Sequence, residues 1–497
     1  MKKIVALLLG SLLLFTGCAS AGGGNTTGGG NKENQDDIGM TIQEAMANKD
    51  FVGPDNVSPI DKNIYIGIQS QTKVFDAEEE VGYYVMVLGE LEEDLDLTIG
   101  LESDFTGKKS ENTHALKAGR EQQTIAGKIS GESLGILRFH VTAKNGAGET
   151  VMDQSKDVAV WAVTERFKGE SVKWNKPPTL DAWQSYVDRV ASLYAEQEHV
   201  IIEIINECNW PDFFYGTAQE YIDILDASYE TFADTGLTVI NGGMVMPQAN
   251  NYVTEESEKF TFAEDGKYYQ KYGELYKSGK LPYVAYHSHA NFQTFIEKDS
   301  VNMMYYLQDA GIPQEALFLN ESGMFNADGA LQADDVIKKA LWTKCNDHKG
   351  FVLFNFRDIE GGVLSPPGWG IITQDGQPKE SYPAYTYAIA ALSGYRNKHV
   401  YANTLYNAYL MDNGTNNILV LFKDKSVPEA EVSLPDGYKA YDMFGNEIAG
   451  KIDKIGDNPV YVVFDGQVDP SDIGLTIPQG YKINLSEYGR IDNFPDQ

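Results

Sequence analysis

Two glutamates in this sequence each close a short apolar run, and each is preceded by an asparagine. Asn206 and Glu207 follow the run 200–205, and Asn320 and Glu321 follow a second run of the same character. An apolar run that ends in polar residues is typical of a buried strand reaching the surface. Because parallel strands of a barrel present their carboxyl ends at one face, the two carboxyls are expected to meet there. A protonated carboxyl and an ionised one, facing each other across a gap, are the groups that cleave glycosidic bonds.

The segment 166–395, which contains both glutamates, alternates helical and strand-like patterns. An alternation of this kind could place the two strand ends at one face of a parallel sheet. Thr179 is expected to cap a helix whose apolar residues, from Trp183 to Tyr194, recur at helical spacing. Further helices are predicted over 221–232, 268–276, 303–307, 336–342 and 385–392, and strands over 200–205, 237–240, 283–286, 316–319 and 351–354. Repeated strand–helix units with apolar strands predict a parallel sheet, either open or closed into a barrel.

All-β patterns flank this segment on both sides. Residues 57–165 contain short apolar runs separated by glycine, asparagine and aspartate, namely 64–68, 83–87, 137–141 and 158–163. Residues 396–497 contain two further runs, 418–422 and 460–464, and Phe444-Gly445-Asn446 is expected to form a hairpin turn. We therefore predict a multidomain fold, with an α/β, barrel-like catalytic domain over 166–395 between two all-β sandwich domains.

The N-terminus has the pattern of a bacterial lipoprotein. Lys2 and Lys3 precede the apolar run 4–15, which is too short to span a membrane as a helix. The sequence Phe-Thr-Gly-Cys at 15–18 resembles a lipobox, which implies a signal peptide over 1–17 and lipidation of Cys18. Residues 18–56 then contain the lipidated cysteine and a glycine-rich flexible linker. We expect an extracytoplasmic protein anchored by lipid to the cell membrane or surface; the alternative is an ordinary secretory signal.

The composition excludes some classes of partner. The formal net charge is −32 at pH 7, which repels phosphate backbones and argues against a nucleic-acid partner. The 29 Tyr and 22 Phe suit large cores, and they also suit stacking on sugar rings. Apart from Cys18, only Cys208 and Cys345 are present, and the sequence shows no disulfide framework, metal-ligand spacing or cofactor motif.

The glutamate motifs resemble those of the clan A glycoside hydrolases, in which the catalytic carboxylates stand on strands 4 and 7 of a β/α barrel. Asn206 and Glu207 match the strand 4 motif, and Glu321 matches the strand 7 position. The resemblance implies that Glu207 is the acid/base, that Glu321 is the nucleophile and that Asn206 binds the 2-hydroxyl of an oligosaccharide or polysaccharide substrate. It also implies a retaining double displacement, with the carboxyls about 5–5.5 Å apart.

The same resemblance indicates residues around the sugar. Strand 6 of the family often offers a histidine or tyrosine facing the nucleophile, which implies His287 and, as second choice, Tyr286. Strand 8 of the family usually ends in a tryptophan under the sugar. The matching run 354–358 lacks it here, and Phe356 or Trp369 is expected to substitute.

Two further features have competing interpretations. Trp210, just past Glu207, is expected to flank the cleft, although this and the other aromatic residues fit plain packing equally well. His287 and His289 have a spacing that two metal ligands could use. The same spacing on a strand suits packing or loop capping, which we favour.

The barrel that the resemblance implies is incomplete in this sequence. Five strand–helix units match strands 4 to 8, and the roughly 40 residues between the 158–163 run and Glu207 are too few for strands 1 to 3. We therefore expect a partial TIM-type barrel. Two functions compete: a glycoside hydrolase, favoured because both glutamates are present, and a surface carbohydrate-binding lipoprotein with a decayed barrel. A serine hydrolase ranks far below both.

Overall fold

The computed structural model describes most of the chain after residue 57, in ranges that leave gaps: 58–61, 64–68, 74–76, 80–103, 106–120, 122–131, 134–161, 175–197, 199–245, 265–326, 328–358 and 368–488. The predicted signal peptide, the lipidated Cys18 and the linker lie outside the described residues. Two compact units are present. One comprises the described residues of Ala19–Val200 and Glu220–Leu237, and the other those of Ile201–Gln219 and Thr238–Gln497.

The first unit contains two β-sheets that share one apolar core. Its strands are β1 (Ser58–Asp61), β2 (Ile64–Ile68), β3 (Val74–Asp76), β4 (Glu80–Leu88), β5 (Leu95–Glu102), β6 (Lys109–Leu116), β7 (Gln122–Ser130), β8 (Gly135–Asn145) and β9 (Thr150–Trp161). One sheet has the order β1-β2-β4-β7 and the other β3-β9-β8-β5-β6. Only β3 and β9 pair in parallel. Val85 of β4 and Ile99 of β5 are both buried in the common core, an arrangement typical of a β-sandwich.

Two helices of this unit bear out the predicted helical pattern. α2 (Leu180–Tyr194) begins at the predicted cap, because the Thr179 hydroxyl accepts a hydrogen bond from the Ala182 backbone N at 3.4 Å. α3 spans Ala218–Phe232, and all but its first two residues belong to this unit. The Trp183 indole Nε1 of α2 donates to Ser228 Oγ of α3 at 2.8 Å, so the apolar stripe of α2 faces a helix.

The second unit is built on parallel strands that occur in chain order. They are β10 (Ile201–Ile204), β11 (Thr238–Asn241), β12 (Met244–Val245), β13 (Val284–His287), β14 (Leu317–Ser322) and β15 (Gly350–Leu353). β10 pairs with β11, and β12-β13-β14-β15 form a four-stranded sheet; every pairing is parallel. Only Gly242 and Gly243 separate β11 from β12. The five predicted strands of this segment are therefore confirmed.

Burial differs between the middle and the ends of this series of strands. All four residues of β13 are buried, whereas all four of β15 are partly exposed. Ile201 of β10 is 37% exposed. Among the described residues, neither β10 nor β15 pairs with a further strand. The outer strands are thus less covered than their apolar sequences alone would predict.

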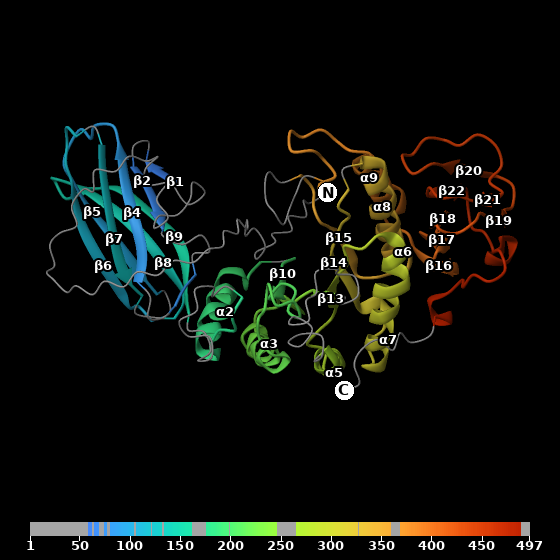
Figure 1. Cartoon of the computed structure of the whole chain (residues 1–497), viewed down its shortest axis with the longest axis horizontal. Helices are drawn as coiled ribbons and strands as arrows, with labels where there is room; N and C mark the ends of the chain where they lie inside the picture. The colour runs from blue at the N-terminus through green and yellow to red at the C-terminus, as the bar shows by residue number, and fades with distance from the viewer. Residues whose placement is uncertain are drawn as a thin grey trace, which may run out of the picture. The chain divides into compact units, whose positions relative to one another are not determined.

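Helical segments connect the parallel strands. They are α5 (Asp265–Lys277), α6 (Phe292–Thr294), a π-helix (Phe295–Ser300), α7 (Val301–Asp309), α8 (Gly329–Cys345) and α9 (Ser381–Leu392), with a short 3-10 turn at Gln314–Ala316. The predicted helices 268–276, 303–307, 336–342 and 385–392 coincide with α5, α7, α8 and α9. Among the described residues, none of the helices has the length and apolarity to cross a bilayer. Figure 1 shows α8 between strands β13 to β15 and the C-terminal strands, and Trp342 of α8 donates to the Asn403 backbone O at 3.0 Å.

The C-terminal strands form a five-stranded and a three-stranded sheet in the second unit. The strands are β16 (Arg396–Asn403), β17 (Tyr406–Asp412), β18 (Asn417–Lys423), β19 (Ala430–Ser433), β20 (Tyr438–Tyr441), β21 (Lys454–Ile455), β22 (Val460–Phe464) and β23 (Gly474–Thr476). Their orders are β16-β17-β18-β22-β20 and β21-β19-β23. The predicted turn is confirmed: Gly445 has φ 89° and the Asp442 backbone N donates to the Asn446 O at 2.9 Å.

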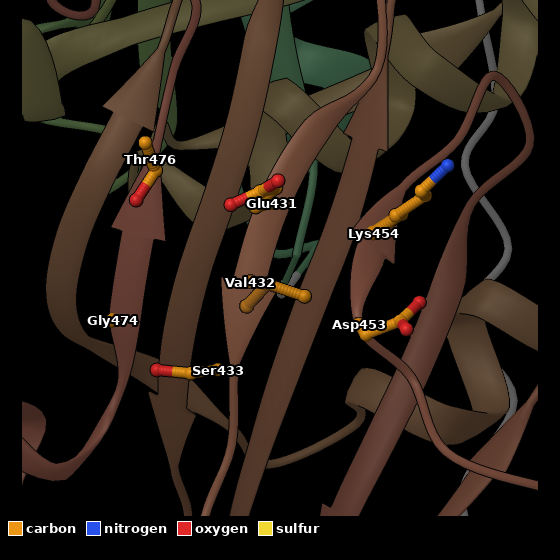
Figure 2. A pocket seen from close by; sticks show the side chains of 7 residues that line it. All are labelled: Glu431, Val432, Ser433, Asp453, Lys454, Gly474 and Thr476. Atoms are coloured by element: carbon orange, nitrogen blue, oxygen red, sulfur yellow. The ribbon is translucent and has the colours of Figure 1, made fainter.

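A cavity of about 280 Å³ lies on the smaller C-terminal sheet, and Figure 2 shows the residues around it. They come from β19, β21, β23 and their flanks. Its charged residues, Glu431, Asp453 and Lys454, are all exposed. Lys454 pairs with the exposed Glu429 at 2.7 Å, and solvated charges of this kind are typical of a surface hollow rather than of a catalytic centre.

Candidate active site

A sharp turn at the end of β10 carries Glu207. The strand ends at Ile204, and both Ile205 (φ 62°) and Glu207 (φ 44°) adopt the left-handed conformation. This conformation is costly for a β-branched residue and persists where surrounding contacts impose it. The Asn209 side chain supplies such contacts: its Nδ2 donates to the Val245 O at 3.0 Å, and its Oδ1 accepts from the Val245 N at 2.9 Å. The turn that carries Glu207 is thereby fixed to β12.

Glu321 lies in β14, next to the strand that supplies His287. β13 and β14 are paired in parallel, and His287 stands opposite Glu321 in their register. The backbone N of Ser288 donates to the Glu321 O at 3.2 Å, which continues the pairing past the end of β13. His289 follows on the same segment, and its Nε2 lies 3.2 Å from Glu321 Oε1. Two consecutive strands therefore place both histidines beside one carboxylate.

His287 joins the two predicted catalytic glutamates. Its Nδ1 lies 2.8 Å from Glu207 Oε1 and 3.9 Å from Glu321 Oε2. Three side-chain atoms lie within 4.8 Å of one another, one each from Glu207, His289 and Glu321. The carboxyls are thus brought face to face at the carboxyl ends of β10 and β14. An oxygen of each carboxyl is thus within 4.8 Å of the other, so both groups face the same small space.

The charges of this cluster favour an ionised Glu321 and a protonated His287. Burial alone would raise the pKa of Glu321, but the positive charge of His287 and the hydrogen bond from His289 lower it to about 2. Burial likewise opposes a charged His287, yet the charge of Glu321 and the hydrogen bond to Glu207 raise the pKa of His287 to about 9. At neutral pH the cluster therefore holds an imidazolium beside an ionised carboxylate.

A third glutamate, Glu203 of β10, was missed by reasoning from the sequence. Its Oε1 accepts from the Gly243 backbone N and its Oε2 from Asn320 Nδ2, both at 2.7 Å. His287 Nε2 lies 3.9 Å from Glu203 Oε1. Burial raises the pKa of Glu203 against the opposing effects of His287 and these two hydrogen bonds. The available signal was a charged residue inside an otherwise apolar run, 200–205, because unpaired charges are rarely buried.

The other predicted sugar-contacting residues have mixed placements. Asn206 and Trp210 are partly exposed on the turn around Glu207. Tyr286 is fully buried and lies on the face of β13 opposite to His287, because successive strand residues alternate sides. Burial raises the pKa of Tyr286, followed in effect by the charge of Asp299. The structure therefore does not bring Tyr286 to the carboxyls, whereas Asn206 borders one of them.

Of the two aromatic residues predicted to replace the family's tryptophan, only Trp369 contacts the cluster. Its ring lies 5.0 Å from that of His289, edge to face, and 5.6 Å from that of Phe354. Phe325, 43% exposed, lies 5.8 Å from Trp369 on another side. Phe356 is 59% exposed and contacts the ring of Tyr382 instead. Trp369 is thus the aromatic side chain next to the hydrogen-bonded pair His289–Glu321.

The cluster also contains the elements of a cation site. Glu207, His289 and Glu321 could each offer one ligand atom, as a three-ligand metal centre requires. A divalent cation there would have to share both carboxylates with the imidazolium of His287, which it would repel. His287 and His289 also bond to different carboxylates, not to one common point. We therefore interpret the cluster as a hydrogen-bonded acid–base centre.

A buried lysine supports the segments that carry His289 and Glu321. Lys339 of α8 is fully buried, and its Nζ donates to the backbone O atoms of Ser288 (3.4 Å), Ala290 (2.9 Å) and Gly323 (2.6 Å). Burial lowers the pKa of Lys339 to about 8, against the charges of neighbouring aspartates. One of these is Asp299, which accepts from Ser288 Oγ at 2.5 Å. The ammonium group of Lys339 thus connects the loops that follow β13 and β14.

Replacing Lys339 with methionine is expected to lower the free energy of unfolding of the second unit by about 2–4 kcal/mol, because three backbone carbonyls lose their hydrogen-bond donor and the Asp299 carboxylate loses a nearby positive charge. Chemical denaturation followed by tryptophan fluorescence measures this loss. The exposed Lys280 gives the matched control, and Lys280→Met should change the free energy by less than about 0.5 kcal/mol. Equal effects of the two substitutions would contradict the supporting role.

One Gly-x-Ser-x-Gly motif is present, at 131–135, and it has the spacing of a serine-hydrolase nucleophile elbow. It falls in the connection from β7, which ends at Ser130, to β8, which starts at Gly135. A nucleophile elbow joins a strand to a helix, whereas this connection joins two strands. The motif therefore gives no support to serine-hydrolase chemistry.

Comparison with known proteins adds structural neighbours only, since no family profile and no curated protein matches this chain. A family 39 glycoside hydrolase from the gut symbiont Bacteroides cellulosilyticus WH2 has 12% identity and a TM-score of 0.36, covering 80% of this chain and 100% of that one. A family 30 subfamily 8 xylanase, Xyn30A, from Clostridium acetobutylicum has 10% identity and a TM-score of 0.36, covering 57% and 72%.

A putative β-galactosidase from Bacteroides fragilis has 11% identity and a TM-score of 0.25, with 83% of this chain and 72% of that chain covered. The structural neighbours are thus glycoside hydrolases of several families. At these identities and TM-scores the likeness assigns neither a substrate nor an activity to this chain, and its function has to be argued from the glutamate cluster.

Proposed function

We propose that this protein is a retaining glycoside hydrolase with Glu207 as acid/base and Glu321 as nucleophile. The observation that carries the proposal is the meeting of two strand-end carboxyls within 4.8 Å. Carboxyl oxygens this close suit direct attack by one carboxylate, as in a retaining mechanism. The low pKa of Glu321, about 2, gives the ionised group that attack requires. The parallel series β10 to β15 supports a partial β/α barrel as the scaffold.

The first step forms a covalent intermediate. The Glu321 carboxylate attacks the anomeric carbon, the bond from that carbon to the leaving oxygen breaks, and Glu207 gives its proton to that oxygen. The Nδ1 of His287 contacts Glu207 Oε1 at 2.8 Å, so Oε2 is the Glu207 oxygen left to exchange a proton with the leaving group. In the second step Glu207 takes a proton from a water molecule, whose oxygen attacks the anomeric carbon and releases Glu321.

The surroundings of the pair suit a sugar. Trp369 presents an aromatic ring next to His289 and Glu321, and pyranose C–H faces pack on such rings. The Asn206 side chain makes no hydrogen bond to a described residue and is partly exposed beside Glu207, so it is available for a sugar hydroxyl. We propose an oligosaccharide or polysaccharide as substrate, with a lipid anchor at Cys18 holding the enzyme outside the cytoplasm, on the strength of the 15–18 motif.

A second candidate function is sugar binding without hydrolysis. The observation in its favour is that β10 and β15 have no further strand partner among the described residues, although a full barrel closes on itself. A barrel of five strand–helix units would lack the side chains that early strands place around the sugar. The retained glutamate pair and its charged histidine favour the hydrolase.

The decisive experiment offers purified protein a panel of 4-nitrophenyl glycosides and plant and bacterial polysaccharides. Release of nitrophenol or reducing ends is expected for at least one class, and ¹H NMR should first show the anomer that retains the substrate's configuration. The opposite anomer would overturn the retaining mechanism. Binding of an oligosaccharide by calorimetry, with no hydrolysis across the panel, would establish the binding function instead.

Gly243 offers a test of the placement of His287. It has no side chain, and a Cβ there would overlap the Nε2 edge of the buried His287 ring. Gly243→Ala is therefore expected to push the ring from Glu207 and lower kcat/KM about 10–100-fold, since small displacements of catalytic groups are costly. The matched control is Gly456→Ala, because an added Cβ there meets nothing within 4 Å. Equal activity of both variants would show that the ring position is irrelevant.

A further inference from the structure

The side chain of Glu203 connects three strands beneath the proposed catalytic pair. It belongs to β10, and it accepts hydrogen bonds from the Gly243 N, at the junction of β11 and β12, and from Asn320 Nδ2 of β14. β10 and β14 are not neighbours in either sheet. A side chain that reaches Asn320 from β10 therefore joins two strands that do not pair with each other. The carboxylate of Glu203 acts as a clamp between the strands that carry the two catalytic glutamates.

His287 lies between this clamp and the catalytic pair. Its Nδ1 edge faces Glu207, at 2.8 Å, and Glu321, at 3.9 Å. Its Nε2 edge faces Glu203, at 3.9 Å, and Nε2 has no hydrogen-bond partner. The charged and titratable groups that face the ring are therefore Glu203 and Glu207 from β10 and its turn and Glu321 from β14, with His289 bonded to Glu321. From the β11–β12 junction the Gly243 backbone approaches it.

We propose that Glu203 is a positioning residue of the hydrolase: it fixes Asn320, the chain neighbour of Glu321, and adds its negative charge, behind His287, to those of Glu321 and Glu207 that hold the ring in place as a donor to Glu207. This inference rests on the proposed function. Glu203 itself does not touch the reacting atoms. Its charge and its two hydrogen bonds make separate contributions, which different substitutions separate.

Glu203→Gln removes the charge and keeps the clamp. The side-chain oxygen of the new glutamine still accepts from the Gly243 N. Its side-chain nitrogen can donate to Asn320 Oδ1 once the Asn320 amide turns over, because Oδ1 is a buried atom with no hydrogen-bond partner. We expect kcat at the pH optimum to stay within about threefold of the wild type. The basic limb of the kcat/KM profile should move to lower pH by about one unit, because the imidazolium has lost a nearby negative charge.

Glu203→Ala removes both the charge and the clamp. The Gly243 N and the Asn320 amide then lose their acceptor, and Glu321 is no longer fixed through its neighbour. We expect kcat to fall about 10–100-fold with KM changed less than about threefold, because the catalytic geometry suffers more than sugar binding. A kcat that falls in Glu203→Ala but not in Glu203→Gln would show that kcat depends on the two hydrogen bonds of Glu203 and not on its charge. Glu315→Gln, at an exposed position in the same unit, is the control for loss of one charge and should match the wild type.

A measurement that needs no turnover completes the test. Protein labelled with ¹⁵N-histidine has 7 histidine signals, and loss of one signal in His287→Gln assigns the ring in question. We expect the His287 ring to titrate at lower pH in Glu203→Gln than in the wild type. An unchanged titration, or two Glu203 variants with wild-type kcat and an unmoved basic limb, would overturn the role of Glu203. A wild type that hydrolyses nothing overturns the proposed function, while the titration still decides whether Glu203 sets the charge of His287.

Discussion

Replacing Glu321 with alanine is expected to lower kcat/KM on an aryl glycoside by about 10⁴-fold or more, because no group is left to form the covalent intermediate. Added azide should restore turnover, since a small anion fits the space of the missing carboxylate and attacks the same face of the anomeric carbon. The product should be a glycosyl azide with the configuration opposite to that of the substrate. NMR of the isolated azide measures this directly.

The control for this experiment is the same substitution at another partly buried glutamate of the same cluster, Glu203→Ala, which leaves the nucleophile in place. Azide should not accelerate that variant, and no glycosyl azide should form. Recovery of a hydrolysed sugar alone from Glu321→Ala, without an azide adduct, would mean that another residue is the nucleophile. The nearby position of Glu207 makes it the first candidate in that case.

Replacing Glu207 with glutamine should have the second largest effect, and its size should depend on the leaving group. General acid catalysis contributes about 10²–10⁴-fold, so a substrate with a basic leaving group should lose about that much. A dinitrophenyl glycoside needs no protonation of its leaving oxygen, so its first step should continue and the covalent intermediate should accumulate. Mass spectrometry of the intact protein would detect the added sugar.

Azide distinguishes Glu207 from Glu321 by stereochemistry. In Glu207→Gln the azide attacks the intermediate in place of water, so the glycosyl azide should retain the configuration of the substrate. The two variants are therefore expected to give opposite anomers. The same anomer from both would contradict the assigned roles. Asn206→Asp adds a charge beside Glu207 and leaves both catalytic carboxyls in place, so it should give no azide adduct.

The regular elements were predictable because they depend on local patterns. The apolar run before Asn206 became β10, and the helical spacing after Thr179 became α2 with its predicted cap. Periodic apolar residues and capping residues act over a few positions, and one sequence contains all the information they use. The turn at Phe444-Gly445-Asn446 was predictable for the same reason, since glycine adopts φ 89° there without strain.

The site was predictable only in part. Glu207, Glu321 and His287 were named from strand ends, and they lie together because parallel strands align those ends. Tyr286 was named as the second choice at the same strand end, but the alternation of side chains turns it to the opposite face. Which face of β13 points to the carboxyls depends on the register with β14, and this register is a property of the packed sheet.

The sequence alone determined which residues we propose for the chemistry: an asparagine–glutamate pair at each of two strand ends, in a strongly acidic chain. Only the tertiary structure decided that Glu203 supports them, that Trp369 rather than Phe356 contacts their cluster and that Lys339 holds the loops beneath. These contacts join residues 16 to 117 positions apart. Their existence depends on which strands and loops pack together, and no local pattern in the chain specifies that.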